Sequence, residues 1–509
     1  MVEPRPIGST LKQPLLGQRL SLPELPSHEP WDVVIIGGGI TGAGIALEAS
    51  RRQWRVLLLE QKDFSWGTSS RSSKMVHGGL RYLAQGAVTL TRQALQERER
   101  MLAELPDLVV RMPYLFPIRR GSFPGRWAMT AVLRLYDSLA GIRDHQWMSR
   151  DAVLKAYPAL KPDGLRGAMR YTDALTDDSR LVIRILQEAA LEGATVRNYT
   201  EVIDIDPQGH HSTLTLQDTD TGERTQVRAR HVFNATGLWA DRLSGTPAVV
   251  RPQRGTHLFV SAQRLPVQDC LTIRHPDDGR PVFVFPWKGQ TCIGTTDLDH
   301  QGDLHDEPHC HSAEIDYLLQ VANSEMPHLH LSRGDILATM AGVRPIIASG
   351  RGRHPSKERR DHLVWKQGRV ISVSGGKLTT FRHMALDALK AAGLIDAAAH
   401  RRAHDDRQQR CFTHAVAAPQ GLNNPVGALA EGDQLRAHVR WILQHEMVLH
   451  LDDLLLRRLR AGVLCADAGA SLLPIIEPLC RTLLGWTDAR WQSECQRYVH
   501  TIHNSYRLG

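Results

Sequence analysis

The chain has 509 residues, 42% of them hydrophobic, and this length predicts two or three domains with large buried cores. No run of about 18 consecutive apolar residues occurs, which excludes a membrane-spanning helix. The seven cysteines lack the CxxC spacing of zinc and iron–sulfur sites, so we expect a reducing compartment and no bound metal. The net charge of +8 suits anionic lipid, nucleic acid or an anionic substrate, but the sequence has no groove-reading element and no interleaved basic and aromatic residues, so we expect no nucleic acid among its partners.

The N-terminal part of the chain predicts a flexible tail followed by a βαβ unit. Residues 1–30 carry a few basic residues among prolines and leucines and have no apolar run resembling a secretion signal. The apolar runs Val33–Ile36 and Val56–Leu59 flank a helical stretch, which is the pattern of strand, helix and second strand. Further along, Thr89–Leu105 and Arg126–Leu139 are amphipathic and predict two helices.

The rest of the chain predicts a second sheet and then a helical region. Short apolar strands are expected at His231–Asn234, His257–Val260, Val282–Pro286, Thr291–Gly294 and Val370–Val373. The strands within about 250–340 predict an antiparallel sheet that forms the floor of a substrate pocket. A helix is expected at Leu378–Ala392, and two more at Leu435–His445 and Leu451–Leu464. We therefore expect an α/β region over residues 31–398 and a helical C-terminal domain over residues 411–509.

A glycine fingerprint lies between the first predicted strand and the first helix. Gly37, Gly39 and Gly42 form GxGxxG, and Glu60 ends the second strand. The glycines allow a tight turn, a close approach of the backbone to a pyrophosphate and close packing of helix on strand, while the helix N-terminus stabilises the anion. Glu60 is placed to hold ribose hydroxyls, which fits FAD or NAD and disfavours a 2′-phosphate. A merely tight turn is the alternative, but all parts of the pattern agree with a dinucleotide site.

Three later motifs resemble one family, the FAD-dependent glycerol-3-phosphate dehydrogenases of the bacterial aerobic, quinone-linked type. They are the serine-rich stretch Thr68–Leu83, Gly342–Pro345 and Ser374–Thr380, and the resemblance extends from about Trp31 to Arg382. It implies a Rossmann-type FAD-binding domain with an antiparallel substrate sheet, as in glutathione-reductase-like and amino-acid-oxidase-like flavoproteins. A weaker similarity continues into the helical C-terminal region.

The resemblance implies FAD as cofactor and assigns its contacts. Small hydroxyl residues and glycines are suited to line an extended cofactor, and N–H groups at a helix start are suited to stabilise an anionic reduced flavin. The structural alternatives are an ordinary loop for Thr68–Lys74, a strand-ending turn for Asn234–Gly237 and a glycine turn at Gly375 and Gly376. Beyond the fingerprint, the implied FAD contacts are Thr68, Ser69, Ser70, Ser73, Lys74, His77, Gly78, Gly237, Gly375, Gly376, Leu378 and Thr379.

The resemblance also implies the substrate, sn-glycerol 3-phosphate, which the family oxidises to glycerone phosphate. A phosphate requires cations, and arginine recognises it through two parallel N–H donors. The implied substrate contacts are Arg81, Tyr82, Arg344, Arg360 and Lys377, with Arg344 and Lys377 also named as catalytic. Arg359 is the alternative to Arg360, because the turn after this basic stretch is shorter than in the family. His257 is the expected general base, since a neutral imidazole can accept the proton of the C2 hydroxyl.

Family members of this type pass their electrons to a quinone at a membrane surface. Two predicted helices, Arg126–Tyr136 and Leu451–Leu464, combine apolar faces with arginines, as interfacial helices do, although helices packed in a core have the same pattern. The expected location is therefore cytoplasmic, peripheral on the cytoplasmic face of the inner membrane. The cysteine-rich C-terminal domain of the anaerobic relatives and the calcium-binding loop of the mitochondrial ones are not found in the sequence.

Two other functions remain open at this point. A related flavoenzyme could oxidise an amino acid or a 2-hydroxy acid, whose carboxylate requires only one arginine. A flavin- or nucleotide-binding regulator without turnover, with its basic surface on nucleic acid, would lack a functional base. The sequence is compatible with a homodimer but does not define the oligomeric state.

Overall fold

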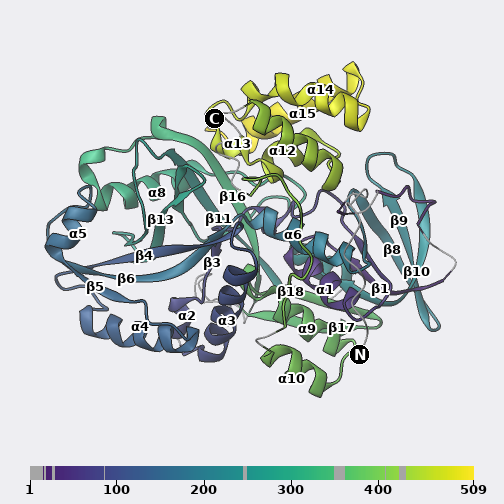
Figure 1. Ribbon diagram of the computed structural model, residues 1–509, viewed down its shortest axis with the longest axis horizontal. Helices are drawn as coiled ribbons and strands as arrows, with labels where there is room; N and C mark the ends of the chain where they lie inside the picture. The colour runs from purple at the N-terminus through teal and green to yellow at the C-terminus, as the bar shows by residue number, and fades with distance from the viewer. Residues whose placement is uncertain are drawn as a thin grey trace.

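Two β-sheets lie side by side, each covered by helices, and a group of C-terminal helices packs along one side of the molecule, at the top of the view (Figure 1). The computed structural model describes residues 15–16, 19–25, 29–84, 86–244, 249–348, 361–406, 409–423 and 432–508. The predicted architecture, a Rossmann-type unit with an antiparallel-sheet domain and a helical C-terminal part, is confirmed. The predicted limits 1–30, 31–398 and 411–509 stay a prediction.

The first sheet has eight strands and a parallel centre. Its parallel members, in spatial order, are β18 (Val370–Gly375), β10 (Arg224–Asn234), β1 (Trp31–Ile36), β2 (Val56–Leu59) and β7 (Thr195–Arg197). The antiparallel members are β17 (His362–Gln367), β8 (Thr200–Gln208) and β9 (His211–Asp218). The expected βαβ unit is confirmed, because β1 and β2 flank α1 (Ile40–Ser50). Helix α1 packs between α6 (Asp178–Leu191) and α9 (Phe381–Ala391), which explains why ten of its eleven residues are buried.

The second sheet has ten strands and is almost entirely antiparallel. Its strands are β3 (Met75–Val76), β4 (Val109–Arg119), β5 (Gln146–Ser149), β6 (Leu165–Thr176), β11 (Val250–Ser261), β12 (Cys270–Arg274), β13 (Pro281–Trp287), β14 (Gln290–Gly294), β15 (Leu298–Asp299) and β16 (Ile336–Ile347). The strands predicted within 250–340 are confirmed, but the sheet is larger than predicted, because β4 and β6 join it through the pairing of β4 with β12.

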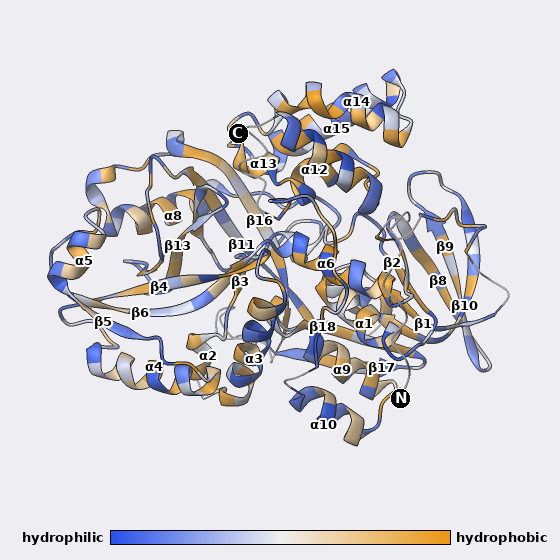
Figure 2. Cartoon of the chain, in the orientation of Figure 1, coloured by the Kyte–Doolittle hydropathy of each residue, from blue (hydrophilic) through white to orange (hydrophobic). Residues whose placement is uncertain are grey.

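Further helices cover the second sheet and the outside of the first. On the second sheet they are α2 (Leu80–Ala84), α3 (Val88–Glu104), α4 (Arg126–Ala140), α5 (Arg150–Ala156) and α8 (Ser312–Glu325). On the first sheet, α7 (Ala240–Ser244) follows β10 and α10 (Ala397–Asp405) packs on α9. Figure 2 shows hydrophobic residues gathered on the strands and hydrophilic ones on outer helices such as α10. No helix in the described part of the chain is both long and apolar enough to cross a membrane.

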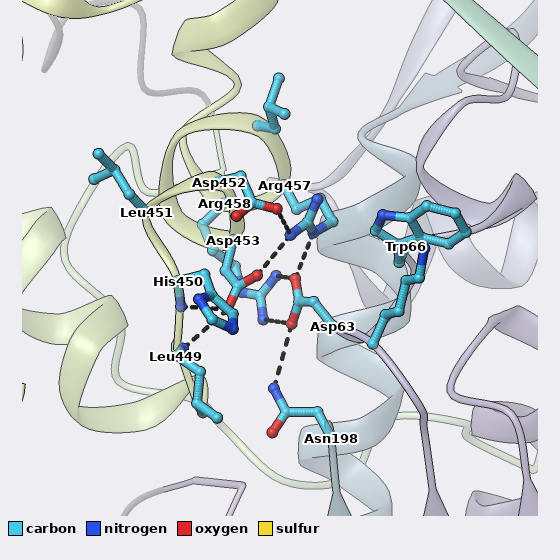
Figure 3. Close-up of polar contacts among 12 residues, drawn as sticks. Asp63, Trp66, Asn198, Leu449, His450, Leu451, Asp452, Asp453, Arg457 and Arg458 are labelled. Atoms are coloured by element: carbon cyan, nitrogen blue, oxygen red, sulfur yellow. Dashed lines mark hydrogen bonds and ion pairs between the residues drawn. The ribbon is translucent and has the colours of Figure 1, made fainter. Parts of the chain in front are cut away.

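The C-terminal group consists of α12 (Gly432–His445), the π-helical segment Asp453–Arg458, α13 (Ala461–Leu464), α14 (Leu473–Leu484) and α15 (Asp488–Ser505). The helix predicted over Leu451–Leu464 is thus interrupted, and Arg460 has a left-handed backbone with φ of 62°. The prediction that this stretch lies on a membrane is also wrong. All of its residues are buried, and Arg457 and Arg458 form ion pairs with Asp63 of the first domain (Figure 3).

Part of the predicted N-terminal tail is packed against the first sheet. Leu22 and Leu25 are buried against residues of β1 and β2, and the Arg19 guanidinium lies 2.8 Å from the Asp218 carboxylate. The expectation of a loose tail is therefore wrong for residues 19–25, because their leucines cover one face of the sheet. Residues 1–14 lie outside the described part of the chain.

Candidate active site

A cavity of about 620 Å³ lies between the two sheets and is lined by residues of both. It extends from the carboxyl ends of β1 and β2, where ligands bind in open α/β sheets, to β13 and β16 of the second sheet. The predicted residues that line it are Gly37, Gly39, Glu60, Thr68, Ser69, Ser73, His77, Tyr82, Gly237, Arg344, Gly375, Gly376, Lys377, Leu378 and Thr379. Segments far apart in the chain thus meet around one elongated space.

The glycine turn and the start of α1 form one end of the cavity. A Cβ at Gly42 would lie 1.9 Å from the Gly37 carbonyl oxygen, so only glycine lets helix and strand approach this closely. Gly39 is the N-cap of α1 and offers no side chain to the helix end. The neighbouring Ile40 N–H donates to Ser69 Oγ at 3.0 Å, which ties the serine-rich loop to the helix start. An open helix N-terminus beside hydroxyl groups is suited to a diphosphate.

Glu60 is held in a fixed orientation at the same end. Its Oε2 accepts the Gly38 N–H at 2.7 Å and its Oε1 accepts the Lys62 N–H at 2.9 Å. Burial raises the pKa of the Glu60 carboxyl despite these two hydrogen bonds. Because each carboxylate oxygen has a second lone pair, the group can still accept hydrogen bonds from ribose hydroxyls in the cavity.

The turn between β18 and α9 forms another wall. Gly375 and Gly376 have φ of 81° and 75°, a left-handed conformation that favours glycine. Leu378 and Thr379 follow and lead into the start of α9. The Lys377 ammonium lies 3.6 Å from the centre of the Tyr82 ring, a cation–π contact that fixes its place in the cavity. Two glycines, a helix start and a lysine therefore border one region of the cavity, which suits a group that becomes anionic.

Arginines line the cavity on the second sheet. Arg344 on β16 donates from Nη2 to Thr295 Oγ1 at 2.8 Å, and its Nη1 lies 3.4 Å from Asp297 Oδ1. Arg280, immediately before β13, donates to the Asp297 carbonyl oxygen at 3.2 Å and forms an ion pair with Asp278. Asp297 therefore separates two guanidinium groups, and both still contact the cavity.

His257 lies behind the cavity wall and not in it. The side chain is fully buried on β11, and its Nε2 lies 3.0 Å from the Oγ of Ser73, which does line the cavity. Burial, with help from the nearby Arg344 and Lys74 charges, lowers the pKa of His257 well below its ordinary value, so the imidazole is neutral. His257 was predicted to contact the substrate directly. In the structure, the imidazole reaches the cavity only through the Ser73 hydroxyl.

Four predicted cofactor contacts also lie outside the cavity lining: Gly42, Ser70, Lys74 and Gly78. The Lys74 ammonium is buried 2.8 Å from both carboxylate oxygens of Asp178 and donates to the Ser70 carbonyl oxygen at 2.7 Å. It fastens the serine-rich loop to α6 and is not available to a phosphate. The Gly78 N–H donates to Asp173 at 3.2 Å, and a Cβ there would lie 2.4 Å from the Leu95 side chain. Gly78 thus serves the packing of α3.

Two predicted substrate residues are not described by the structure, and three cations were missed. Arg360 and its alternative Arg359 lie outside the described residues, as does the side chain of Arg81 on α2. The missed cations that line the cavity are Arg71, Arg242 and Arg280. Arg71 stands inside the serine-rich motif and could have been found there. Arg280 follows an ordinary turn sequence, so only the pairing of β12 with β13 brings it to the cavity.

Known proteins of one family are similar to this chain. A family model described as "FAD dependent oxidoreductase" matches residues 32–385, and another described as "C-terminal domain of alpha-glycerophosphate oxidase" matches residues 414–491. The aerobic glycerol-3-phosphate dehydrogenase of Staphylococcus haemolyticus is 35% identical over 74% of this chain and 69% of its own. The glycerol-3-phosphate dehydrogenase of Mycobacterium leprae is 33% identical over 94% of this chain and 89% of its own.

A solved structure shows the same fold. The glycerol-3-phosphate dehydrogenase from Bacillus halodurans, complexed with FAD, has a TM-score of 0.71 at 24% sequence identity and matches 94% of this chain and 95% of its own. The residues present here fit FAD, because a glycine turn, an open helix start and an oriented carboxylate share one elongated cavity. The chain therefore belongs to the family of FAD-dependent oxidoreductases, with glycerol-3-phosphate dehydrogenases among its relatives.

Proposed function

We propose that this protein oxidises sn-glycerol 3-phosphate to glycerone phosphate and passes the electrons to a quinone. The choice of substrate rests on one observation. The cavity that begins at the dinucleotide turn contains the cations Arg344, Arg280 and Lys377. A phosphate monoester carries nearly two negative charges at neutral pH, so it requires more than one cation. The carboxylate of an amino acid or a 2-hydroxy acid requires only one. The names of the similar proteins support the same substrate.

The substrate loses a hydride from C2 and a proton from its C2 hydroxyl. The two-electron oxidant that accepts this hydride would be bound FAD. The proton goes to a protein group, and Ser73 with His257 is the arrangement available: the Ser73 hydroxyl lines the cavity and contacts a neutral imidazole at 3.0 Å. Ser73 accepts the substrate proton while giving its own to His257 Nε2, so that charge and protons balance. Arg344 and Lys377 hold the phosphate end and thereby orient C2.

The test of this function is to purify the protein, record its flavin spectrum and add substrates without oxygen. Glycerol 3-phosphate is expected to bleach the flavin, whereas glycerol and lactate are not, because neither fills the cationic cavity. A ubiquinone or menaquinone analogue should then restore the colour. Bleaching by an amino acid or a 2-hydroxy acid alone would assign the protein to the other substrate class, and a protein that binds FAD without any bleaching would be a regulator.

The proton path gives a prediction for Ser73 and His257. Ser73→Ala and His257→Gln are each expected to lower kcat by about 100-fold, the usual contribution of a general base, with little change in KM. Since both residues belong to one path, the double variant should be no slower than the slower single one. Ser73→Thr, which keeps a hydroxyl, should recover part of the rate. Steady-state kinetics of the flavin-loaded variants checks this, and additive losses or an unchanged Ser73→Ala enzyme would exclude the path.

We propose a peripheral place on the cytoplasmic face of the inner membrane, where a quinone is accessible. Of the two helices predicted to lie on a membrane, α4 buries Met129, Leu133 and Tyr136, but this helix and the turn before it also expose three large apolar residues. The exposed fractions are 78% for Phe123, 77% for Trp127 and 46% for Leu135. The exposed Arg126 and Arg134 lie on the same helix and suit anionic lipid. This surface supports the membrane part of the proposal.

Membrane contact through α4 predicts a specific loss of lipid binding. The double variant Phe123→Ser, Trp127→Ser is expected to bind vesicles containing phosphatidylglycerol at least about tenfold more weakly, because burying each aromatic side chain stabilises binding by about 1.5–3 kcal/mol. Val499→Ser is the matched control, since Val499 is a 62% exposed apolar residue of α15. Co-sedimentation with vesicles measures the effect. Equal losses in both variants, or none, would contradict the proposed contact.

A further inference from the structure

Four histidines and one aspartate meet on the outside of the first sheet, away from the cavity. His362 lies on β17, His383 and Asp387 lie on α9, and His400 and His404 lie on α10. None of them lines the cavity. The cluster therefore has no part in the proposed oxidation and requires its own explanation.

The Asp387 carboxylate is the centre of this cluster. Its Oδ1 lies 2.5 Å from His400 Nε2 and 3.5 Å from His404 Nε2, and its Oδ2 lies 2.8 Å from His362 Nε2. Asp387, His400 and His404 each offer one ligand atom, and these three atoms lie within 4.8 Å of one another. The side chains of both α10 histidines remain 13% exposed, so an ion from solvent can reach them.

Ion pairing alone explains this arrangement poorly. One carboxylate neutralises a single imidazolium, yet three imidazoles contact it from two elements. The His400 and His404 rings also lie 4.5 Å apart, where two positive charges would repel each other. A divalent cation removes this conflict, because neutral imidazoles and a carboxylate are the ligands of zinc-type ions.

The helical spacing supports the same conclusion. His400 and His404 are four residues apart, which places both rings on one face of α10, as in helical zinc motifs. Asp387 approaches this face from α9, so the two helices supply three ligands in all. A fourth position is left for water, as is common for zinc sites with three protein ligands.

The surrounding groups hold the ligands as outer partners of a metal site do. His383 Nδ1 lies 2.7 Å from His404 Nδ1, so the His404 N–H can donate to it and leave Nε2 for a metal. The other nitrogen of His383 lies 3.4 Å from the buried carboxylate of Glu97. On the other side, His362 contacts the second oxygen of Asp387. His404 and Asp387 are thus each oriented by a second residue.

We propose that Asp387, His400 and His404 bind one divalent transition-metal ion of the zinc type, with His383 and His362 as their hydrogen-bonding supports. The ion joins α10 to α9, the helix that begins at the flavin-facing turn. The cysteine spacing gave no sign of this site because no cysteine belongs to it.

Equilibrium dialysis of the flavin-loaded protein against Zn²⁺, followed by metal analysis, tests the site. The protein is expected to bind zinc with a Kd that rises about 100-fold or more in the double variant His400→Gln, His404→Gln, which loses two ligands. His383→Gln keeps all three ligands but removes the support of His404, so a smaller rise of about 10- to 100-fold is expected. Zn²⁺ should also raise the Tm of the unmodified protein and not that of the double variant.

The matched control uses the other cluster of this kind in the described residues. His414 lies with Glu188 and Glu192, so His414→Gln removes a histidine from that cluster alone and should leave the Kd at Asp387 unchanged. Asp387→Asn, which keeps the size of the side chain, serves if the double histidine variant does not fold. Unchanged zinc affinity in the folded double variant, or a loss of equal size in His414→Gln, would overturn the proposal.

Discussion

Replacing Arg344 with alanine is expected to lower kcat/KM for glycerol 3-phosphate by roughly 100- to 1,000-fold while FAD stays bound. Arg344 lies on β16, and contacts to Thr295 and Asp297 fix its guanidinium at the cavity wall. Losing one partner of a largely buried ion pair costs about 3–4 kcal/mol, which corresponds to this range. Because the arginine is anchored before the substrate arrives, little side-chain entropy is lost on binding.

Arg344→Lys separates charge from geometry. Lysine keeps the positive charge but offers no pair of parallel donors, so we expect it to recover only part of the lost activity. The comparison requires steady-state kinetics with glycerol 3-phosphate, together with absorbance spectra that report flavin content. Arg166→Ala is the matched control, since Arg166 is an exposed arginine on β6. If Arg344→Ala and Arg166→Ala turn over equally fast, the phosphate does not bind at Arg344.

Local spacing made the dinucleotide end of the site predictable. Gly37, Gly39 and Glu60 lie within one βαβ unit, where strand, turn and helix determine one another, and the structure gathers all three in the cavity. Lys74 shows the limit of such reasoning. It stands in the motif that contributes most to the cavity, but Asp178, more than 100 residues further along the chain, binds its ammonium group. Only the folded structure reveals which of two anions, a phosphate or a buried carboxylate, a lysine contacts.

The same limit applies to the second sheet and to the C-terminal arginines. The strands β4 and β6 are separated from β12 by long stretches of chain, so periodicity could not place them in one sheet. An amphipathic pattern with arginines, as in Leu451–Leu464, predicts a surface helix unless buried carboxylates are available. Here Asp63, Asp177 and Asp178 supply them, and the arginines are buried. These carboxylates belong to another domain, so the sequence pattern of the helix alone could not predict them.

These buried ion pairs lead to the second large effect, on stability. Arg458→Met is expected to lower the free energy of unfolding by about 3–5 kcal/mol, because it leaves the Asp63 carboxylate buried with too little positive charge around it. Both side chains are fully shielded from water, and the guanidinium contacts both carboxylate oxygens at 2.8 Å (Figure 3). Arg457, at 2.6 Å from the same carboxylate, remains but already pairs with Asp452 and Asp453.

The dependence on pH identifies the carboxylate as the cause. Burial alone would raise the pKa of Asp63, but the charges of Arg458 and Arg457 lower it below its ordinary value of 3.8. The folded-state pKa is therefore the lower one, so the stabilising contribution is fully present above about pH 4 and is lost as the pH falls through the folded-state value. We expect the difference in stability between the unmodified protein and Asp63→Asn to shrink below pH 4.

Urea unfolding at neutral and acidic pH measures these differences, with flavin release as a second signal. Asp63 follows Glu60 by three residues, so loosening this loop should also weaken FAD binding. The matched control is Glu477→Gln, which breaks the partly exposed ion pair with Arg481 on α14 and should cost no more than about 1 kcal/mol. In the double variant Asp63→Asn, Arg458→Met no unpaired charge is left, so its loss should be smaller than the sum of the two single losses. If the double variant instead loses as much stability as the two single variants together, Asp63 and Arg458 do not stabilise the domain contact as a pair.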